Sequence, residues 1–250
     1  MKKLFLALTA FACLLPLSAC ETNDTLGRSQ LLLVNDSDLE SAAVQAWAET
    51  LKTAKISNDP VLRQRVKTVS ARIVAAAGMD NRPWEYVLFD DPEPNAFVIP
   101  GNKVGVNTGL FQIVKNDDQL AAVIGHETGH VIAHHAAERY SQQLASSLAI
   151  SVVAGAAGEK NAQAVQSFGG LGAQVGILLP YSRQHELEAD RIGVDLMARA
   201  GFKPSQAVEV WRNMIAYRKG SAPLEIISTH PSDETRIAKL QAYIAEKGYN

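Results

Sequence analysis

Helical periodicity dominates the pattern of apolar and polar positions along the chain. Apolar residues recur at three- and four-residue spacings over Ser41–Thr53 and Asp59–Ala77, which predicts two amphipathic helices. Gly78 follows the second pattern as a typical helix stop. Similar patterns near the end of the sequence predict helices over Pro204–Lys219 and Pro231–Lys247.

Strand signals are confined to one short region between the early helices and the middle of the chain. Trp84–Phe89 is rich in aromatic and β-branched residues, which are typical of a strand. Two shorter strands are expected at Ala96–Ile99 and Lys103–Val106, joined by a turn at Pro100-Gly101-Asn102. A short helix is expected over Leu110–Lys115. These elements predict an α+β fold that is mainly helical.

A segment rich in Ala, Gly and Ser, Ser141–Leu179, has broken apolar runs shorter than the roughly 20 residues of a membrane span. Two small-residue helices packed on the core are the favoured interpretation, ahead of a helical flap that contacts membrane or an unfolded client. Trp211 and Met214, in the helix expected over residues 204–219, are interpreted as core residues rather than substrate contacts.

The most informative chemistry lies in His126-Glu127-Thr128-Gly129-His130, the HExxH pattern of a zinc peptidase. Asp117–Gly125 leads into it with a helix start and an apolar run. Residues four apart on a helix lie one above the other, so His126 and His130 present two imidazoles to one ion. Glu127 is adjacent to these ligands and is placed to accept a proton from a metal-bound water.

A catalytic zinc site needs a third protein ligand. His134 lies about 12 Å along the helix from His126, too far to share one ion with both histidines of the motif. A third histidine six residues after His130 is absent, because that position is Ala136. Glu138 is also too far along the same helix.

Glu186 is the best remaining candidate for the third ligand. Glu186 and Asp190 are four apart on a predicted second helix, so both can face the first helix. Asp190 is then expected to accept the free N–H of a ligating histidine and fix its orientation. Glu188 is two residues from Asp190 and is expected to face elsewhere.

HExxH followed by Glu186-Leu-Glu-Ala-Asp190 on a later helix resembles the gluzincin peptidases of the HtpX and CAAX-prenyl-protease type. Pro94–Gly101, Val106–Leu110 and Ser228–Ser232 extend the resemblance to roughly residues 40–247. It is strongest to the periplasmic lipoprotein members, LoiP-like or BepA-like, here without tetratricopeptide repeats. The resemblance implies a zincin-like domain, with a small antiparallel sheet beside the HExxH helix and one Zn²⁺ per chain.

Three further expectations concern residues around that centre. His230 is expected to approach the metal, either donating to an oxyanion or occupying the water position and silencing the enzyme. Arg236 is expected to hold Asp190 or the tetrahedral intermediate through its planar donors. The Asn95–Val98 edge is a candidate to pair with an extended substrate, and the alternative is a strand that only completes the sheet. The substrate-binding residues assigned on this edge are Asn95, Ala96 and Phe97.

The N-terminus predicts an exported lipoprotein. Lys2-Lys3 precede an apolar run that ends in Leu17-Ser18-Ala19-Cys20, which resembles a signal peptide with a lipobox. Cys20 is expected to carry acyl chains such as palmitate, and the alternative is ordinary cleavage near Ala19. Glu21 is not the Asp that retains lipoproteins in the inner membrane, so the outer membrane of a Gram-negative bacterium is favoured, facing the periplasm. The expected domains are a signal peptide at 1–19, a tether at 20–40 and a peptidase domain at 41–250.

Composition is consistent with this interpretation. Loss of residues 1–19 leaves 231 residues and moves the formal charge from −2 to −4. Cys13 leaves with the signal, so no internal disulfide is possible in the remainder. The sequence has no basic block of the kind that binds nucleic acid.

The sequence therefore predicts a zinc endopeptidase of periplasmic quality control. The resemblance implies misfolded or stalled envelope proteins as substrates and outer-membrane assembly machinery as a partner. The competing hypothesis is a non-proteolytic assembly factor or chaperone on the same fold, and Glu127 argues against it because a scaffold needs no base. A structural zinc protein is the weaker third hypothesis, since only His230 could complete its ligands.

Overall fold

The structure is a computed structural model that describes residues 20–34, 36–156, 182–218, 230 and 234–249. The chain divides into two compact units, residues 1–35 with 136–177 and residues 36–135 with 178–250. The expected signal peptide, the later part of the Ala- and Gly-rich segment and Pro231-Ser232 lie outside the described residues.

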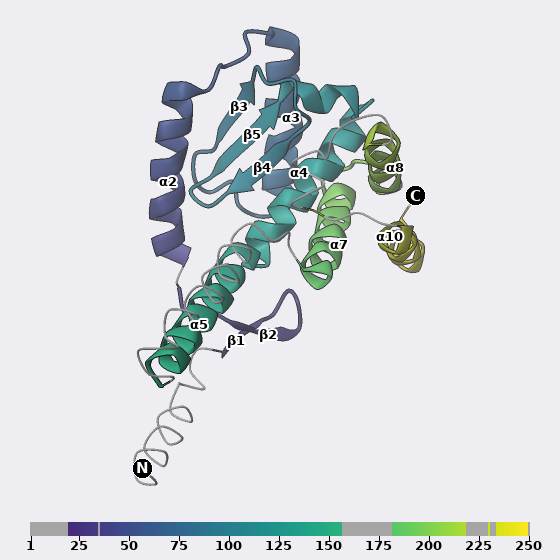
Figure 1. The fold of residues 1–250 in the computed structure, drawn as a ribbon. Coiled ribbons are helices and arrows are strands. Elements are labelled where there is room, and N and C mark those ends of the chain that lie inside the picture. Colours follow the sequence, from purple (N-terminus) through teal and green to yellow (C-terminus); the bar gives the residue numbers. More distant parts are fainter. Residues whose placement is uncertain (1–19, 35, 157–181, 219–229, 231–233, 250) are drawn as a thin grey trace. The chain divides into compact units, whose positions relative to one another are not determined.

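The larger unit contains a three-stranded sheet in the order β3-β5-β4 (Figure 1). Strands β3 (Glu85–Phe89), β4 (Ala96–Ile99) and β5 (Lys103–Asn107) lie close to their expected positions. β4 pairs antiparallel with β5, whereas β3 pairs parallel with β5, so the sheet is mixed. The β4–β5 turn includes Gly101 and Asn102 at φ 86° and 64°, a left-handed conformation that favours these residue types.

Helices cover the sheet. α2 (Asp36–Thr53) brings Trp47 edge-on to Phe89 and Phe97, with ring centroids 5.8 and 6.1 Å away. α3 (Pro60–Ala76) passes behind the sheet in Figure 1 and packs against β3. Strand side chains alternate between the two faces, and those on the face opposite Trp47, apart from Tyr86, are almost fully buried. They include Leu88, Val104 and Val106.

The central helix of this unit is α4 (Asp117–Ile132), which is buried from Gln119 to His130. A short 3₁₀ helix, η2 (Thr108–Gln112), precedes it where the sequence predicted a helix over 110–115. α4 packs against α3, β4, α7 (Arg183–Arg199) and α8 (Gln206–Arg218). α10 (Glu234–Glu246) packs on α7 and α8, so the predicted mainly helical α+β fold is confirmed.

Small residues bring the backbones of α4 and α7 into direct contact. A Cβ added to Gly193 would lie 2.8 Å from the backbone nitrogen of His126 and 2.9 Å from the carbonyl carbon of Gly125. A Cβ added to Gly129 would lie 2.7 Å from the backbone oxygen of Ala189. Because these distances are below van der Waals contact, larger residues would force the two helices apart.

The helix that carries the HExxH motif does not run on through the later histidines. α4 ends at Ile132, and His134 adopts a left-handed conformation with φ 53°. α5 (His135–Ala156) begins at the next residue. The expected continuation of the helical stripe to His134 is therefore wrong, because the left-handed residue breaks the helical periodicity.

The smaller unit contains a hairpin and most of α5. Strands β1 (Cys20–Asn23) and β2 (Arg28–Leu31) pair antiparallel within the segment that was expected to be a polar tether. Arg28 donates through Nη1 and Nη2 to the two carboxylate oxygens of Glu138, each at 2.8 Å, and Gln30 Nε2 donates to Glu138 at 2.6 Å. These bonds hold the hairpin on α5, and the role of residues 20–40 as a lipid-bearing tether stays a prediction.

The described part of the Ala- and Gly-rich segment forms the body of α5, up to Ala156. α5 exposes Tyr140, Leu144 and Leu148, which lie four residues apart along it. Among the described residues, none of the helices combines the length and the hydropathy that a membrane crossing requires.

Candidate metal centre

Two buried helices carry the candidate ligands. His126 and His130 lie on α4, and their Nε2 atoms are 3.1 Å apart. Glu186 lies on α7, with Oε2 at 3.5 Å from His126 Nε2 and Oε1 at 3.4 Å from His130 Nε2. The four residues His126, His130, Glu186 and His230 each offer one ligand atom, and these atoms all lie within 4.8 Å of one another. The structure thus brings together the three ligands expected from the sequence, with His230 beside them.

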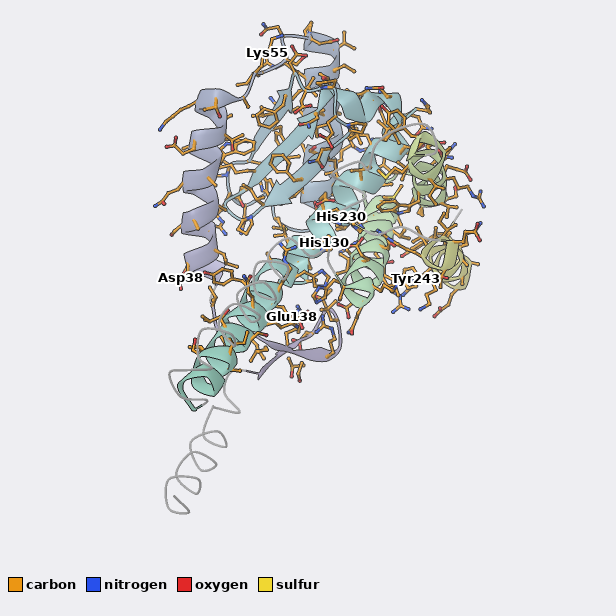
Figure 2. All side chains as sticks on the ribbon, viewed as in Figure 1. Asp38, Lys55, His130, Glu138, His230 and Tyr243 are labelled. Atoms are coloured by element: carbon orange, nitrogen blue, oxygen red, sulfur yellow. The ribbon has the colours of Figure 1, made fainter. Side chains whose placement is uncertain are left out.

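His230, which precedes α10 in the sequence, lies beside this group, and Figure 2 shows it next to His130. His230 Nδ1 lies 3.1 Å from Glu186 Oε1 and 3.4 Å from His126 Nε2. Its Nε2 lies 3.5 Å from Glu127 Oε1. One ring nitrogen therefore faces the candidate ligands and the other faces the candidate base.

Asp190 lies one turn after Glu186 on α7 and contacts the outer side of His126. Its Oδ1 is 2.9 Å from His126 Nδ1. An ionised carboxylate only accepts hydrogen bonds, so this contact places the proton of His126 on Nδ1 and leaves the Nε2 lone pair facing the other candidate ligands. The contact that the sequence predicted for Asp190 is present in this geometry.

Arg236 of α10 neutralises the two buried carboxylates. It donates from Nε to Asp190 Oδ2 at 2.6 Å and from Nη2 to Asp190 Oδ1 at 2.7 Å. Its Nη1 forms an ion pair with Glu186 Oε2. The guanidinium also stacks over Trp211 of α8 at 3.8 Å from the ring centroid. Arg236 is 4% exposed, and of its two expected roles the structure shows the contact with Asp190.

Electrostatics keep these carboxylates charged despite their burial. Burial alone would raise the pKa of Glu186, but the Arg236 charge and the neighbouring His130 and His230 rings outweigh it and hold that pKa well below its usual range. Burial also opposes ionisation of Asp190, yet Arg236 and His126 lower its pKa. Burial holds the pKa of His130 well below its usual value, which favours the neutral ring that binds metal.

The pKa of His230 is shifted in the opposite direction from that of His130. Burial alone would lower its pKa, but the carboxylates of Glu127 and Glu186 raise it above the usual histidine value. The buried Glu127, at 5% exposure, thus lies beside the ligand group without joining it.

The donor set fits a zinc ion. Two imidazole nitrogens and a carboxylate face one another in a buried space, and at least the His126 nitrogen directs a lone pair into it. Nitrogen and oxygen donors of this kind are those that Zn²⁺ binds in catalytic sites, where three protein ligands leave one position open. His126, His130 and Glu186 would supply those three donors.

The candidate substrate edge lies beside α4, and two of its three assigned side chains pack within the domain. β4 is an edge strand and packs against α4. Ala96 is buried, and Phe97 stacks on Phe89 and covers Gly105, where an added Cβ would lie 2.3 Å from its ring. Asn95 accepts a hydrogen bond from the Asn107 backbone N–H at 2.9 Å. The pairing of this edge with a substrate stays a prediction.

Sequence reasoning missed one group of residues around His130. His135 Nδ1 lies 2.9 Å from His130 Nδ1, and His135 Nε2 lies 3.0 Å from Glu188 Oε2. His185 stacks on the His135 ring with centroids 4.3 Å apart. Glu188 is not among the candidate ligands, as the sequence predicted, but His135 links it to His130. The spacing gave no signal for His135, whose position depends on the left-handed residue His134.

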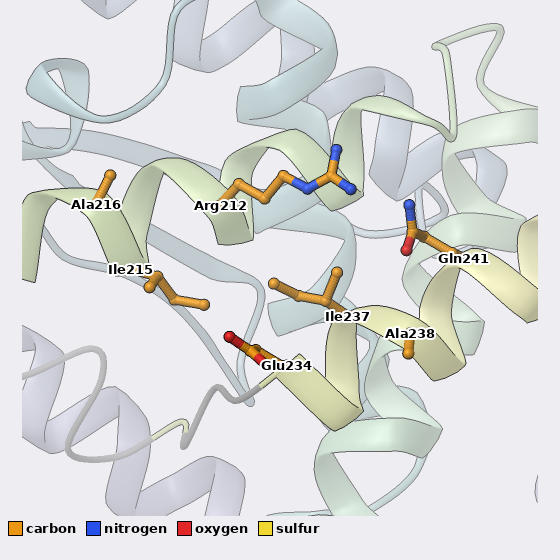
Figure 3. A pocket seen from close by; sticks show the side chains of 7 residues that line it. All are labelled: Arg212, Ile215, Ala216, Glu234, Ile237, Ala238 and Gln241. Atoms are coloured by element: carbon orange, nitrogen blue, oxygen red, sulfur yellow. The ribbon is translucent and has the colours of Figure 1, made fainter.

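A separate surface hollow of about 360 Å³ lies between α8 and α10 (Figure 3). Its polar rim includes Arg212 and Glu234, and its floor includes Ile215 and Ile237. None of the candidate metal ligands lines this hollow, so it is separate from the candidate metal centre between α4 and α7.

Comparison with known proteins identifies relatives of this arrangement. The chain matches the sequence profile of Peptidase family M48 over residues 60–244. It is 41% identical over 183 residues to the mitochondrial metalloendopeptidase OMA1 of Schizosaccharomyces pombe, covering 72% of this chain and 52% of that protein. It is 32% identical over 214 residues to the OMA1 of Saccharomyces cerevisiae, covering 79% and 60%. It is also 32% identical over 194 residues to the beta-barrel assembly-enhancing protease of Escherichia coli, covering 74% and 39%. The chain thus spans about half the length of the curated relatives that it matches.

Proposed function

Because the chain belongs to peptidase family M48, we propose that it is a zinc-dependent endopeptidase whose ion is held by His126, His130 and Glu186. The observation that carries this proposal is the buried convergence of those three side chains beside Glu127. The metallopeptidase class expected from the sequence is confirmed by the family, whereas the lipoprotein branch stays a prediction.

When bound by these residues, zinc would supply Lewis-acid chemistry: it would lower the pKa of a water molecule toward about 7 and polarise the scissile carbonyl. The Glu127 carboxylate would accept a proton from the attacking water and return it to the leaving amine. Asp190 holds His126 with its Nε2 toward His130 and Glu186, where it would bind the ion. Arg236 keeps Asp190 and Glu186 ionised, and the backbone edge of β4 aligns an extended substrate.

His230 controls access to the ion in the resting enzyme. Its Nδ1 lies within 3.4 Å of both Glu186 and His126, which supports occupation of the fourth ligand position. The alternative is stabilisation of the oxyanion by a protonated His230, which the neighbouring carboxylates favour by raising its pKa. We assign the gating role, because the ring already lies among the ligands.

The biological setting that we propose is quality control at the outer membrane of a Gram-negative bacterium, on the periplasmic side. The name of the Escherichia coli relative, a beta-barrel assembly-enhancing protease, supports this setting, and so does the lipobox around Cys20. The substrates would be misfolded or stalled envelope proteins, with outer-membrane assembly machinery as a partner. The two OMA1 relatives are mitochondrial, so family membership alone does not fix the compartment.

The decisive experiment separates the protease from a non-proteolytic assembly factor on the same fold. Glu127→Gln should retain bound zinc and the fold but lose casein cleavage, because only the proton acceptor is removed. Glu209→Gln, which changes an exposed carboxylate on α8, is the matched control. Cleavage by Glu127→Gln at near the wild-type rate would remove Glu127 from the mechanism. Envelope proteins that accumulate with Glu127→Gln relative to wild type would identify the substrates.

A further inference from the structure

We propose that His135 and Glu188 are positioning residues that fix the proton and the ring orientation of His130, and thereby set the affinity of the site for zinc. The inference rests on the proposed function, since it takes His130 as a zinc ligand. Each histidine of the HExxH motif then has its own outer support. Asp190 holds His126, and the pair His135–Glu188 holds His130.

The proton positions along this chain of contacts follow from its outer end. The Glu188 carboxylate accepts hydrogen bonds, so the 3.0 Å contact places a proton on His135 Nε2. A neutral His135 then has its lone pair on Nδ1, which lies 2.9 Å from His130 Nδ1. That contact is a hydrogen bond only if His130 Nδ1 carries the proton. His130 is left with its lone pair on Nε2, the nitrogen that faces His126 and Glu186.

The opposite arrangement would disable the ligand. With the proton of His130 on Nε2, its Nδ1 lone pair would face the lone pair of His135, and an N–H would point at the metal position. The carboxylate of Glu188 thus selects, through one intervening ring, the tautomer of His130 that can bind zinc.

The surrounding side chains hold the relay formed by His130, His135 and Glu188 in place. His135 is fully buried, and the His185 ring stacks on it at an interplanar angle of 23°. Gln184 Nε2 donates to the other oxygen of Glu188 at 2.9 Å. The left-handed backbone of His134 starts a new helix at His135, so that His135 faces His130 across the helix junction. A buried polar cluster with a purely structural role would stabilise the fold without changing the affinity for zinc.

A matched pair of variants separates the two roles. Asn and Leu share the same branched shape, but only Asn has an oxygen that can accept the His130 Nδ1–H. Both His135→Asn and His135→Leu lose the ring and its stacking on His185. We expect His135→Leu to weaken zinc binding by about 10–100-fold, the usual effect of losing the outer partner of a ligating histidine. We expect His135→Asn to restore most of that affinity.

Zinc affinity of the purified full chain is measured by competition with a chelator, beside thermal unfolding of the zinc-free protein. The imidazole N–H of His130, observed by ¹⁵N NMR, should be protected from exchange in the wild type and in His135→Asn but not in His135→Leu. Equal zinc affinities for the two variants would overturn the proposal. Absence of stoichiometric zinc in the wild type would instead overturn the proposed function.

Glu188 provides a second test if both His135 variants fail to fold, since its side chain is partly exposed. Glu188→Gln keeps an oxygen that accepts from His135 Nε2–H, whereas Glu188→Met removes it. We expect Glu188→Met to bind zinc several-fold more weakly than Glu188→Gln. The His130 N–H should also be less protected from exchange in Glu188→Met than in Glu188→Gln. Indistinguishable affinities for these two variants would refute the relay on their own.

Discussion

Replacing Arg236 with Met should destabilise the zinc-free protein strongly at neutral pH. The guanidinium makes two hydrogen bonds to Asp190, at 2.6 and 2.7 Å, and an ion pair with Glu186. Met has a similar apolar stem, so the main loss is the positive charge that compensates the two carboxylates, each of which is at most 4% exposed. Breaking a buried pair by removing one partner costs about 3–5 kcal/mol of unfolding free energy.

The dependence of this loss on pH identifies its cause. In the wild type, the pKa values of Glu186 and Asp190 are depressed. Their ionisation therefore contributes stability above the unfolded pKa values of about 4.3 and 3.9, and this contribution is lost as the pH falls through the folded values. Without Arg236, burial should raise both pKa values above the unfolded ones. The variant should then regain stability as the pH falls, so the difference between the two proteins should be largest near pH 7 and shrink below about pH 5.

Urea unfolding of the zinc-free proteins between pH 4 and pH 7.5 measures this difference. Arg212→Met is the control, because Arg212 forms an exposed ion pair with Glu209 that should contribute at most about 1 kcal/mol. Arg236→Lys, which keeps the charge but loses the planar pair of donors, should fall between Arg236→Met and the wild type. A difference for Arg236→Met that is below about 1 kcal/mol, or that is constant across this pH range, would refute the assignment of Arg236 as the counter-charge of the site.

Four further predictions use the same protein. Gly193→Ala should separate α4 from α7, which should weaken zinc binding and lower the free energy of unfolding by about 1–3 kcal/mol. The control Ile192→Val should lower the free energy of unfolding by about 0.5–1.5 kcal/mol and keep zinc, and equal zinc affinity for both variants would contradict the close contact of the two helices. Glu186→Gln should lose both zinc and casein cleavage, and full metal retention would exclude it as a ligand. His230→Ala should raise basal proteolysis, because we assign His230 the gating role; a fall in turnover of about 10²–10³-fold would instead indicate oxyanion stabilisation, and unchanged activity would leave a structural histidine. Cys20→Ser should abolish incorporation of labelled palmitate, and equal labelling would rule out Cys20 as the acylated residue.

Local patterns predicted the central elements well. The strand at Ala96–Ile99 has the predicted bounds, and the helix expected over Asp59–Ala77 spans Pro60–Ala76 after an Asp59 N-cap. These elements are specified by short-range periodicity and capping, which the sequence displays directly. The β1–β2 hairpin was missed, because the bonds that hold it involve Glu138, more than a hundred positions away.

In the candidate site, too, the local contacts could be predicted from the sequence and the long-range contacts could not. His126 with His130, and Glu186 with Asp190, could be paired from the sequence because a four-residue spacing determines which side chains share a helix face. His135 could not be placed, since its direction depends on one left-handed residue and on how two helices meet. Its contact with Glu188 therefore could not be predicted from the spacing of residues along the sequence.

The order in which the site residues occur along the chain has a consequence for biosynthesis. His126 and Arg236 are 110 positions apart, with the carboxylates of α7 between them. During synthesis or export, the HExxH helix and those carboxylates emerge before the residue that balances their charge. Burial of Glu186 and Asp190 without that cation is costly, so α4 and α7 gain their full stability together only once α10 has arrived. In a nascent polypeptide without α10, the proposed hydrolytic centre should therefore remain incompletely assembled.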